Sequence, residues 1–300
     1  MGRPSPSWKQ RRKPSRTPNS LSGAELATAT SMPAWKRLQK ALRSLCMINS
    51  RQNRTFKNMR RLRRCKGDHA LLEGPHLIHE ALAAGHQPEL VLVTPEFCDR
   101  PEGQELIGTL PAEPTRIAPE LLDSLTDSDS PRGALALVEL PRGGPEGLPR
   151  ADDGLYLYLD RLQDPGNLGA LARTAEAFDA TGLALAPGTV DPNHARALRA
   201  SAGSLLRIPV AVGTEPEALD RHLENSPPAW IALVPRGGVT LDRAALSRPA
   251  VLAIGAEGPG LAEELVARAD LRLTIPVAEP VESLNATVAA ALVLYELRRG

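Results

Sequence analysis

A polar loop over residues 160–169 contains side chains that could take part in chemistry. Pro165 and Gly166 are typical of a tight turn, and Asn167 follows where the N-cap of a helix is expected. Arg173 lies about two helical turns further on. Taken alone, these residues are explained by a helix cap and a solvated arginine. A chemical role therefore depends on what other loops bring to the same place.

A glycine-rich loop follows the apolar segment 251–254. Gly255, Gly258 and Gly260 fall within six residues, which lets a ligand approach the backbone closely. The order GxxGxG differs from the dinucleotide fingerprint GxGxxG and from the phosphate-binding GxxxxGK[ST], so nucleotide binding by either route is disfavoured. Glu257 within this loop is either a surface acid or a positioned hydrogen-bond acceptor.

A third loop, residues 275–285, leads into an alanine-rich helix that we expect over residues 284–297. Ser283 is a good N-cap residue, whereas Asn285 falls inside the predicted helix, where asparagine has a mediocre propensity. The alanines leave this helix little side-chain volume, so it can pack close to another backbone segment. They are Ala286, Ala289, Ala290 and Ala291.

Metal and nucleophile chemistry have weaker support. His76 and His79 are three residues apart, but no further Cys/His cluster completes a ligand set, so no metal site is predicted. Residues 199–203 lack the first glycine of a nucleophile elbow, which argues against a hydrolase. The three cysteines are widely spaced and odd in number, which indicates free thiols.

Short apolar strands separated by helices are predicted across residues 154–300. Apolar residues on both faces of such strands are typical of a parallel sheet covered by helices on both sides. Ligands bind these sheets at the carboxyl ends of the strands, and the loops described above follow strands. We expect strands over 155–159, 183–186, 231–234, 251–254 and 271–275, and helices over 168–178, 194–201, 217–223, 262–267 and 284–297.

Residues 47–140 are predicted to form a smaller α/β domain. Its strands and helices alternate at lengths that favour an open sheet with helices on its faces. A Pro- and Gly-rich stretch without periodicity, residues 141–153, separates it from the second domain as a linker. We expect strands over 70–73, 90–93 and 133–138, and helices over 55–64, 76–84 and 119–125.

Charge is distributed unevenly along the chain. Residues 1–66 hold 18 of the 36 Lys and Arg residues but one of the 35 acidic residues, and the remainder is acidic. A basic segment on an acidic body indicates a polyanionic partner, usually a nucleic acid. For the first 45 residues, a solvated tail that binds nothing specific is the alternative.

Residues 1–46 have little hydrophobic periodicity and are predicted to form a basic, disordered extension. Their Arg- and Ser-rich, acid-poor composition also fits an organelle transit peptide, and a natural start at Met47 is a third explanation. The sequence has no run of about 18 apolar residues and no secretory signal pattern. We therefore expect a cytoplasmic protein that does not span a membrane.

Taken together and in this order, the three loops resemble the SpoU (TrmH-like) family of RNA ribose 2′-O-methyltransferases, part of the SPOUT class. The resemblance covers residues 155–297 and rests on Asp164-Pro-Gly-Asn-Leu-Gly169 with Arg173, on Gly255-x-Glu-Gly-x-Gly-Leu261, and on Glu282-Ser-Leu-Asn285. Residues 48–138 resemble, more loosely, an L30e-like RNA-binding domain. The family implies an α/β protein with a trefoil-knotted, parallel-sheet SPOUT domain after the L30e-like domain, and a homodimer.

The resemblance also implies S-adenosylmethionine as cofactor and methyl transfer to a ribose 2′-hydroxyl of structured RNA, with ribosomal RNA favoured over transfer RNA. Arg173 would be the central catalytic residue. Because a guanidinium is a poor base, we expect it to hold an RNA phosphate, with uptake of the hydroxyl proton as the alternative. The other implied residues are catalytic (Asn167, Glu257, Ser283, Asn285), cofactor-binding (Val234, Gly255, Gly258, Ile275, Leu284) and RNA-binding (Arg51, Arg54, Lys57, Arg60, Arg61, Arg63, Arg64).

Two other hypotheses compete with this one. A non-catalytic RNA-binding protein of the same fold is expected to lack Asn167, Arg173 or Asn285, and all three are present. A nucleotide-dependent dehydrogenase with a doubly wound fold would carry GxGxxG after its first strand, and the sequence does not.

Overall fold

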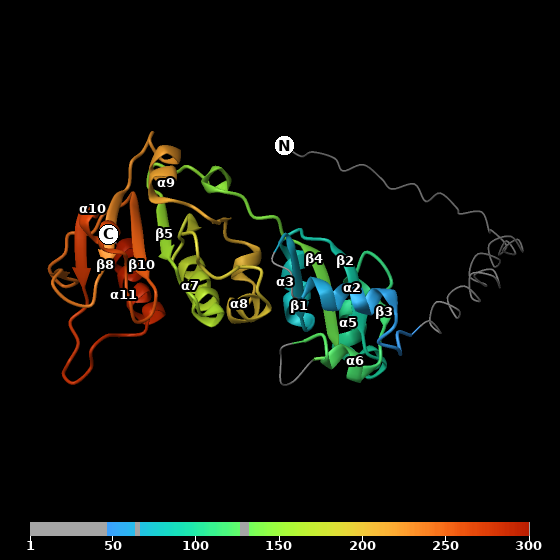
Figure 1. Cartoon of the computed structure of the whole chain (residues 1–300). Helices are drawn as coiled ribbons and strands as arrows, with labels where there is room; N and C mark the ends of the chain where they lie inside the picture. Colours follow the sequence, from blue (N-terminus) through green and yellow to red (C-terminus); the bar gives the residue numbers. More distant parts are fainter. Residues whose placement is uncertain (1–46, 64–66, 127–131, 300) are drawn as a thin grey trace, which may run out of the picture. The chain divides into compact units, whose positions relative to one another are not determined.

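The computed structural model describes residues 47–63, 67–126 and 132–299 (Figure 1). The predicted extension over residues 1–46 and the predicted RNA-binding residue Arg64 lie outside the described residues. Two α/β regions follow each other along the described chain. We call them the N-terminal region, residues 47–140, and the C-terminal region, residues 154–299. Among the helices of these described ranges, none combines the length and hydropathy that a bilayer crossing requires.

The N-terminal region is built on a four-stranded sheet with the order β1-β4-β2-β3. Strand β4 pairs antiparallel with β1 and β2, while β3 pairs parallel with β2. The strands are β1 (His69–Glu73), β2 (Pro88–Val93), β3 (Thr115–Arg116) and β4 (Ala134–Glu139). The helices are α2 (Arg54–Leu62), α3 (Pro75–Ala83), α4 (Pro95–Cys98), α5 (Pro101–Thr109) and α6 (Pro119–Asp123).

Side chains of this sheet alternate between its two faces, as a strand requires. Leu135 and Leu137 of β4 belong to the same apolar cluster as Phe56 and Met59 of α2. Ala134, Ala136 and Val138 belong to the cluster that contains the core residues of α3. Helix α2 is therefore held to the sheet by its apolar side, which leaves its basic residues at the surface.

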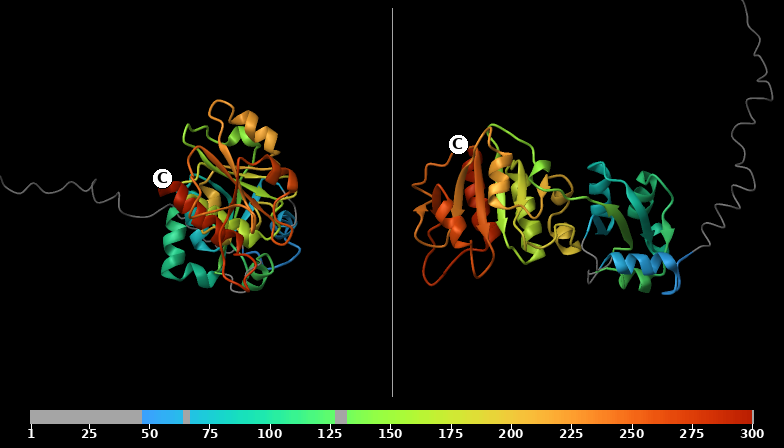
Figure 2. Two further views of the ribbon diagram at one scale, coloured as in Figure 1. Left: turned by 90° about the vertical axis from the view of Figure 1, so that its left-hand side faces the viewer. Right: turned by 45° about the horizontal axis from the view of Figure 1, so that its top comes forward.

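The C-terminal region is built on a seven-stranded parallel sheet with the order β7-β6-β5-β10-β8-β11-β9 (Figures 1 and 2). Its strands are β5 (Leu155–Asp160), β6 (Gly182–Leu185), β7 (Val210–Ala211), β8 (Ala229–Leu233), β9 (Val239–Thr240), β10 (Ala250–Gly255) and β11 (Leu271–Thr274). Its helices are α7 (Pro165–Ala177), α8 (Ala195–Ala200), α9 (Pro216–His222), α10 (Glu263–Arg268) and α11 (Ala286–Arg299), with a 3-10 turn, η2 (Ser204–Leu206).

Both faces of this sheet are covered, as the continuous apolar strands predicted. Leu157 and Leu159 of β5 lie in the cluster that contains the buried residues of α7, α8 and α11. Tyr156 and Tyr158 point to the opposite face and lie in the cluster with the buried leucines of α9 and α10. The prediction of a parallel sheet with helices on both sides is confirmed.

The linker is anchored to the C-terminal region. Arg142 donates from Nε to the Asn193 Oδ1 at 3.1 Å and from a terminal nitrogen to the Leu205 carbonyl at 2.9 Å. Burial lowers the pKa of Arg142 to about 10. A second 3-10 turn, η1 (Pro145–Gly147), lies within the linker, and Leu148 after it is buried. The Pro and Gly residues therefore indicated a boundary between the two regions. They did not indicate that the linker packs against the C-terminal region.

The start of α7 corrects one prediction. Asn167 is not the N-cap, because the helix begins at Pro165 and Asp164 is the cap, with its Oδ1 accepting from the Asn167 backbone N–H at 2.9 Å. Proline is favoured at the first helical position and aspartate caps as well as asparagine does. Pro165 and Gly166 therefore form the first helical turn rather than a separate tight turn.

Candidate functional site

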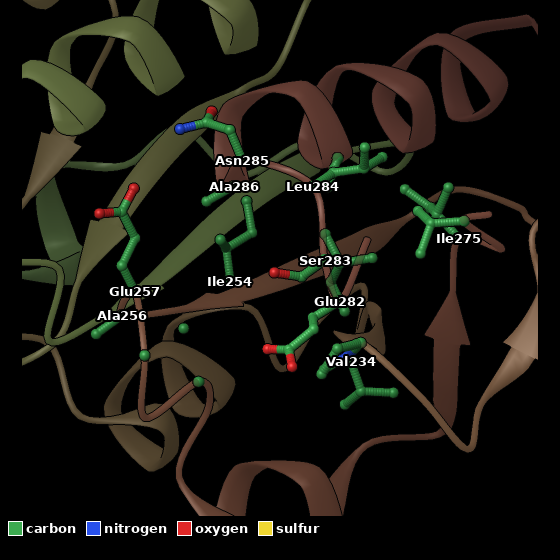
Figure 3. Close-up of a pocket in the computed structure, with 17 residues that line it drawn as sticks. Val234, Ile254, Ala256, Glu257, Ile275, Glu282, Ser283, Leu284, Asn285 and Ala286 are labelled. Carbon is green, nitrogen blue, oxygen red and sulfur yellow. The ribbon is translucent and has the colours of Figure 1, made fainter. Parts of the chain in front are cut away.

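A cavity of about 370 Å³ lies at the carboxyl ends of β8, β10 and β11 (Figure 3). All the predicted cofactor-binding residues line it, namely Val234, Gly255, Gly258, Ile275 and Leu284. The predicted catalytic residues Glu257, Ser283 and Asn285 line it as well. The second and third loops, far apart in the sequence, therefore meet where a parallel sheet places ligands.

The glycine-rich loop folds back on itself at the end of β10. The Gly260 N–H donates to the Ala256 carbonyl at 2.9 Å, and Gly258 and Gly260 have φ of 88° and 73°. These values lie in the left-handed region that favours glycine. A Cβ on Gly255 would lie 2.1 Å from the Gly260 carbonyl carbon, so the two arms of the loop touch through backbone alone.

Asp160 holds the exit of this loop. It ends β5, its side chain is almost fully buried, and its Oδ2 accepts from the Ala262 backbone N–H at 2.9 Å. Arg161 donates from Nε to the other carboxylate oxygen at 3.1 Å. Asp160 is the first residue of the polar loop over residues 160–169, and no role was predicted for it. The available signal was an acid that directly follows an apolar strand.

The third loop corrects two predictions about capping. Ser283 is not the cap of the last helix, and Asn285 is not inside that helix. Helix α11 begins at Ala286, and the Asn285 Oδ1 accepts from the Thr287 backbone N–H at 2.9 Å. Asparagine at this position is therefore explained by capping. Ala286 and Ala289, on the first turn of α11, form part of the cavity wall.

The three loops join through a chain of side-chain hydrogen bonds at one side of the cavity. The Asn167 Nδ2 donates to the Glu257 Oε1, and the Asn285 Nδ2 donates to the Asn167 Oδ1 at 3.5 Å. Figure 3 shows Glu257 and Asn285 on one side of the cavity, with Ile275 and Val234 on the other. Glu257 and Asn285, which line the cavity, are thus joined to each other through Asn167 of α7, which does not line it. We call this set of three side chains the polar triad.

Arg173 is placed differently. It lies on α7, C-terminal to Asn167, and its side chain is exposed. Neither a hydrogen bond nor an ion pair connects it to another residue within the described part of the chain. Its guanidinium is therefore available to a partner from outside the chain, and Arg173 does not line the cavity.

The predicted RNA-binding arginines and lysine that fall within the described residues are all exposed. Asn53 caps α2 by accepting from the Thr55 N–H at 2.8 Å, and the helix presents Arg54, Lys57, Arg60 and Arg61 to solvent. Arg51 precedes the helix, and Arg63 follows it and donates to the Ser124 carbonyl at 2.9 Å. This surface has the charge pattern of a phosphate-binding face.

The described residues define a class: an α/β protein with a parallel sheet, a glycine-lined cavity at the strand ends, and a basic helix on a separate region. No group of His, Cys, Asp or Glu suited to a metal ion occurs within these ranges. The cavity suits a small molecule, and the basic helix suits a polyanion.

Family comparisons identify the particular class. Residues 154–295 match the model of the SpoU rRNA Methylase family, and residues 53–136 match that of the MRM3-like substrate binding domain. The chain is 30% identical over 255 residues to the 23S rRNA (guanosine(2553)-2′-O)-methyltransferase RlmP of Bacillus subtilis, which covers 84% of this chain and 98% of that protein. The chain belongs to the SpoU rRNA methylase family.

Solved structures agree with this assignment. The crystal structure of the SpoU methyltransferase AviRb from Streptomyces viridochromogenes in complex with AdoMet is 27% identical, with a TM-score of 0.76 over 83% of this chain and 98% of that chain. The AdoMet-bound rRNA methyltransferase from Sinorhizobium meliloti is 26% identical, with a TM-score of 0.73 over 84% of this chain and 97% of that chain. The family predicted from the three loops is confirmed, and so is its α/β, parallel-sheet fold. The trefoil knot and the L30e-like class of the N-terminal region stay predictions.

Proposed function

We propose that the protein transfers a methyl group from S-adenosylmethionine to a ribose 2′-hydroxyl of ribosomal RNA. The enzyme class and the cofactor predicted from the loops are both confirmed by the related methyltransferases and the AdoMet-bound structures. The observation that carries the assignment to this chain is the polar triad, two of whose members, Glu257 and Asn285, line a glycine-lined cavity. Ribosomal rather than transfer RNA is favoured because named relatives act on 23S rRNA.

The cavity fits the proposed cofactor in size and in chemistry. Small-molecule sites usually measure about 300–1,000 Å³, and this one is about 370 Å³. Leu233, Ile254 and Ala289 supply apolar walls, while Glu257 and Glu282 supply negative charge. We expect these carboxylates to favour a cationic ligand. When bound, S-adenosylmethionine supplies an electrophilic methyl group on its positively charged sulfur.

The residues of the chain have to align the ribose with that methyl group and assist loss of a proton. The 2′-oxygen forms a bond to the methyl carbon while the carbon–sulfur bond breaks, and the hydroxyl proton leaves. Alignment alone can lower the barrier by roughly 7–11 kcal/mol. We assign positioning of the ribose to the polar triad, of which Glu257 and Asn285 line the cavity, and to Ser283, which lines it as well.

We assign Arg173 to the RNA phosphate next to the target ribose. A guanidinium stays protonated under ordinary conditions and offers five N–H donors in a planar fork that suits phosphate. Its exposure and its lack of a partner in the described part of the chain fit this role. Uptake of the hydroxyl proton by Arg173 is the alternative.

We propose a homodimer that uses the exposed face of α11. Val288, Leu292 and Tyr295 recur at helical spacing and are 50%, 42% and 54% exposed. A continuous apolar stripe on a surface helix is typical of an interface. Helix α11 packs on α7, and the Tyr295 ring lies 6.2 Å from that of Phe178 just after α7. A second subunit on this face would lie near the helix that carries Arg173.

We propose that the basic face of α2 supplies sequence-independent phosphate contacts. Arg51, Arg54, Lys57, Arg60 and Arg61 have no acidic partner within the described residues, so their charge is available to RNA. Such contacts give an affinity that falls with salt. A cytoplasmic location stays a prediction.

The proposed function is tested with purified protein, labelled S-adenosylmethionine and protein-free ribosomal RNA. We expect label in RNA, recovered after nuclease digestion as a 2′-O-methylnucleoside at one or a few positions. Transfer RNA is the parallel substrate. Label in transfer RNA alone would contradict the ribosomal assignment, and label on a base rather than a ribose would contradict the reaction.

A further inference from the structure

Helix α8 connects the N-terminal region to the catalytic helix α7. Arg199, near its end, pairs with Glu73, the last residue of β1. The Glu73 side chain is 5% exposed and the Arg199 side chain 28%, so water screens this contact far less than a surface pair. A buried carboxylate needs a compensating cation, so this pair fixes β1 relative to α8.

The first turn of α8 reaches the other way, to the start of α7. Arg196 pairs with the Asp164 Oδ2 at 3.2 Å. Asp164 is the N-cap of α7, and its other carboxylate oxygen accepts from the Asn167 backbone N–H. Arg199, which binds the N-terminal region, and Arg196, which binds the N-cap of α7, therefore lie one helical turn apart on α8.

The two helices also touch through backbone. A Cβ on Gly169 would lie 2.3 Å from the Ala197 carbonyl oxygen, 2.7 Å from the Ala200 Cβ and 2.8 Å from the Ser201 nitrogen, so α7 packs closely against α8 at this point. Packed interiors have few voids and transmit displacements. A shift of α8 therefore moves the first turns of α7, where Asn167 joins Glu257 and Asn285.

We propose that Glu73 and Arg199 are positioning residues for methyl transfer. Their ion pair sets the place of α8, and α8 in turn holds Asn167 within the polar triad through Arg196, Asp164 and the Gly169 contact. The contact between the N-terminal region and α8 is thereby coupled to the position of Asn167 within the polar triad. The proposal rests on the proposed function and adds to it residues that contact neither cofactor nor reacting atoms.

A second set of contacts between the two regions supplies a matched control. Glu80 of α3 pairs with Arg207, which also donates from Nε to the Glu176 Oε1 at 2.6 Å. The hydrogen bond from Arg207 holds the pKa of Glu176 below its ordinary value. Arg207 follows η2 and reaches α7 near its C-terminal end, away from Asn167. We therefore expect loss of Glu80 to weaken the contact between the two regions without loosening α8.

The test compares Glu73→Gln, Arg199→Gln, their double variant, Arg199→Lys and Arg196→Gln with the control Glu80→Gln, all in the full-length protein. Steady-state methylation gives kcat and the KM for RNA. Calorimetric titration gives the Kd for S-adenosylmethionine, and thermal unfolding reports folding. Wild-type protein in the same assay separates failure of the proposed function, which would leave it inactive, from failure of the coupling.

We expect Glu73→Gln, Arg199→Gln and Arg196→Gln each to lower kcat at saturating RNA by about tenfold to 100-fold, because small misplacements of reacting groups cost that much. The cofactor Kd stays at the wild-type value. The double variant falls no further than the single ones, as expected for one linked contact. Arg199→Lys recovers part of the rate, and Glu80→Gln keeps the wild-type kcat.

A change confined to the KM for RNA in the Glu73 and Arg199 variants would overturn the proposal, because it would indicate docking alone. An equal loss of kcat in Glu80→Gln would overturn it too. If Arg199→Gln does not fold, Arg196→Gln decides, since that side chain is 58% exposed. A wild-type kcat in Arg196→Gln would then refute the coupling.

Discussion

The cavity and the exposed face around Arg173 differ in their surroundings. Residues of this chain line the cavity, whereas the face around Arg173 is open to a partner. The cavity is lined by backbone and side chains of three strand ends and two loops, and the loop arms at Gly255 and Gly260 are in contact. Arg173 is exposed and has no partner in the described ranges, and its helix α7 packs on α11, which carries the apolar stripe. The single chain is therefore prepared to bind a cofactor, whereas the catalytic face requires RNA and, we propose, a second subunit.

This difference predicts that cofactor binding and methyl transfer can be separated by mutation. Residues of the cavity should affect both, because transfer requires a bound donor. Residues of the exposed face around Arg173 should affect methyl transfer but not cofactor binding. The following variants test that division, from the largest expected effect to the smallest.

Arg173→Ala should produce the largest loss. We expect kcat to fall by about 100-fold or more, as found when a group that acts only on the reacting substrate is removed, with an unchanged Kd for S-adenosylmethionine. Rapid-quench methylation and calorimetry measure the two quantities. The control is Arg243→Ala, another exposed arginine whose side chain is 82% accessible. Near wild-type transfer by Arg173→Ala would refute the assigned role.

Gly255→Ala should weaken binding of the cofactor in the cavity. The added Cβ would lie 2.1 Å from backbone atoms of Gly260 and Leu261, so the loop must open. We expect the cofactor Kd to rise by about tenfold or more, which corresponds to about 1.4 kcal/mol. Gly108→Ala on α5 is the matched control, because its Cβ meets nothing within 4 Å. A wild-type Kd for Gly255→Ala would show that the loop does not hold the cofactor.

Leu292→Glu tests whether a second subunit binds to the exposed face of α11. A charge in an apolar interface is costly to bury unless it is paired, so we expect sedimentation to show monomers where wild type forms dimers. Methylation should fall with the dimer fraction. Val239→Glu, at a position 44% exposed on β9, is the control. If Leu292→Glu sediments with the same mass as a wild-type dimer, the exposed face of α11 is not the interface.

Neutralising α2 should have the mildest effect on the chemical step. With Arg54, Lys57, Arg60 and Arg61 changed to Gln, we expect the slope of log K against log salt to become shallower by about 3, since each phosphate contact contributes about 0.7–0.9. The kcat at saturating RNA should not change. Filter binding across salt concentrations measures the slope. If the slope is the same as in wild type, this helix does not contact phosphates.

The sequence predicted the parts of the fold that depend on local pattern. Apolar runs located β5, β6, β8, β10 and β11 to within about two residues. The two-residue strands β3, β7 and β9 and the helices α4 and α5 were missed. Two residues are too few for periodicity to appear, and α4 and α5 each begin at a proline, which reads equally well as a turn.

The sequence grouped residues that meet in space without giving their contacts, and their roles stay predictions. The family resemblance grouped Val234, Gly258 and Leu284, and they line one cavity, whereas Asn167 and Arg173 do not line it. Capping was assigned to Asn167 and Ser283 because both are good caps, yet Asp164 and Asn285 hold those positions. Local propensity cannot choose between neighbouring good caps. Contacts such as Asp160 with Ala262 depend on three-dimensional packing between distant segments.

The most direct measurement is a crystal structure of the protein with S-adenosylmethionine. The account predicts density for the cofactor in the cavity, in contact with residues 255–260 and 282–286, with its methyl group directed toward Asn167 and Glu257. Density at another surface, or an empty cavity at saturating cofactor, would contradict the claim that these loops form the methyl-donor site.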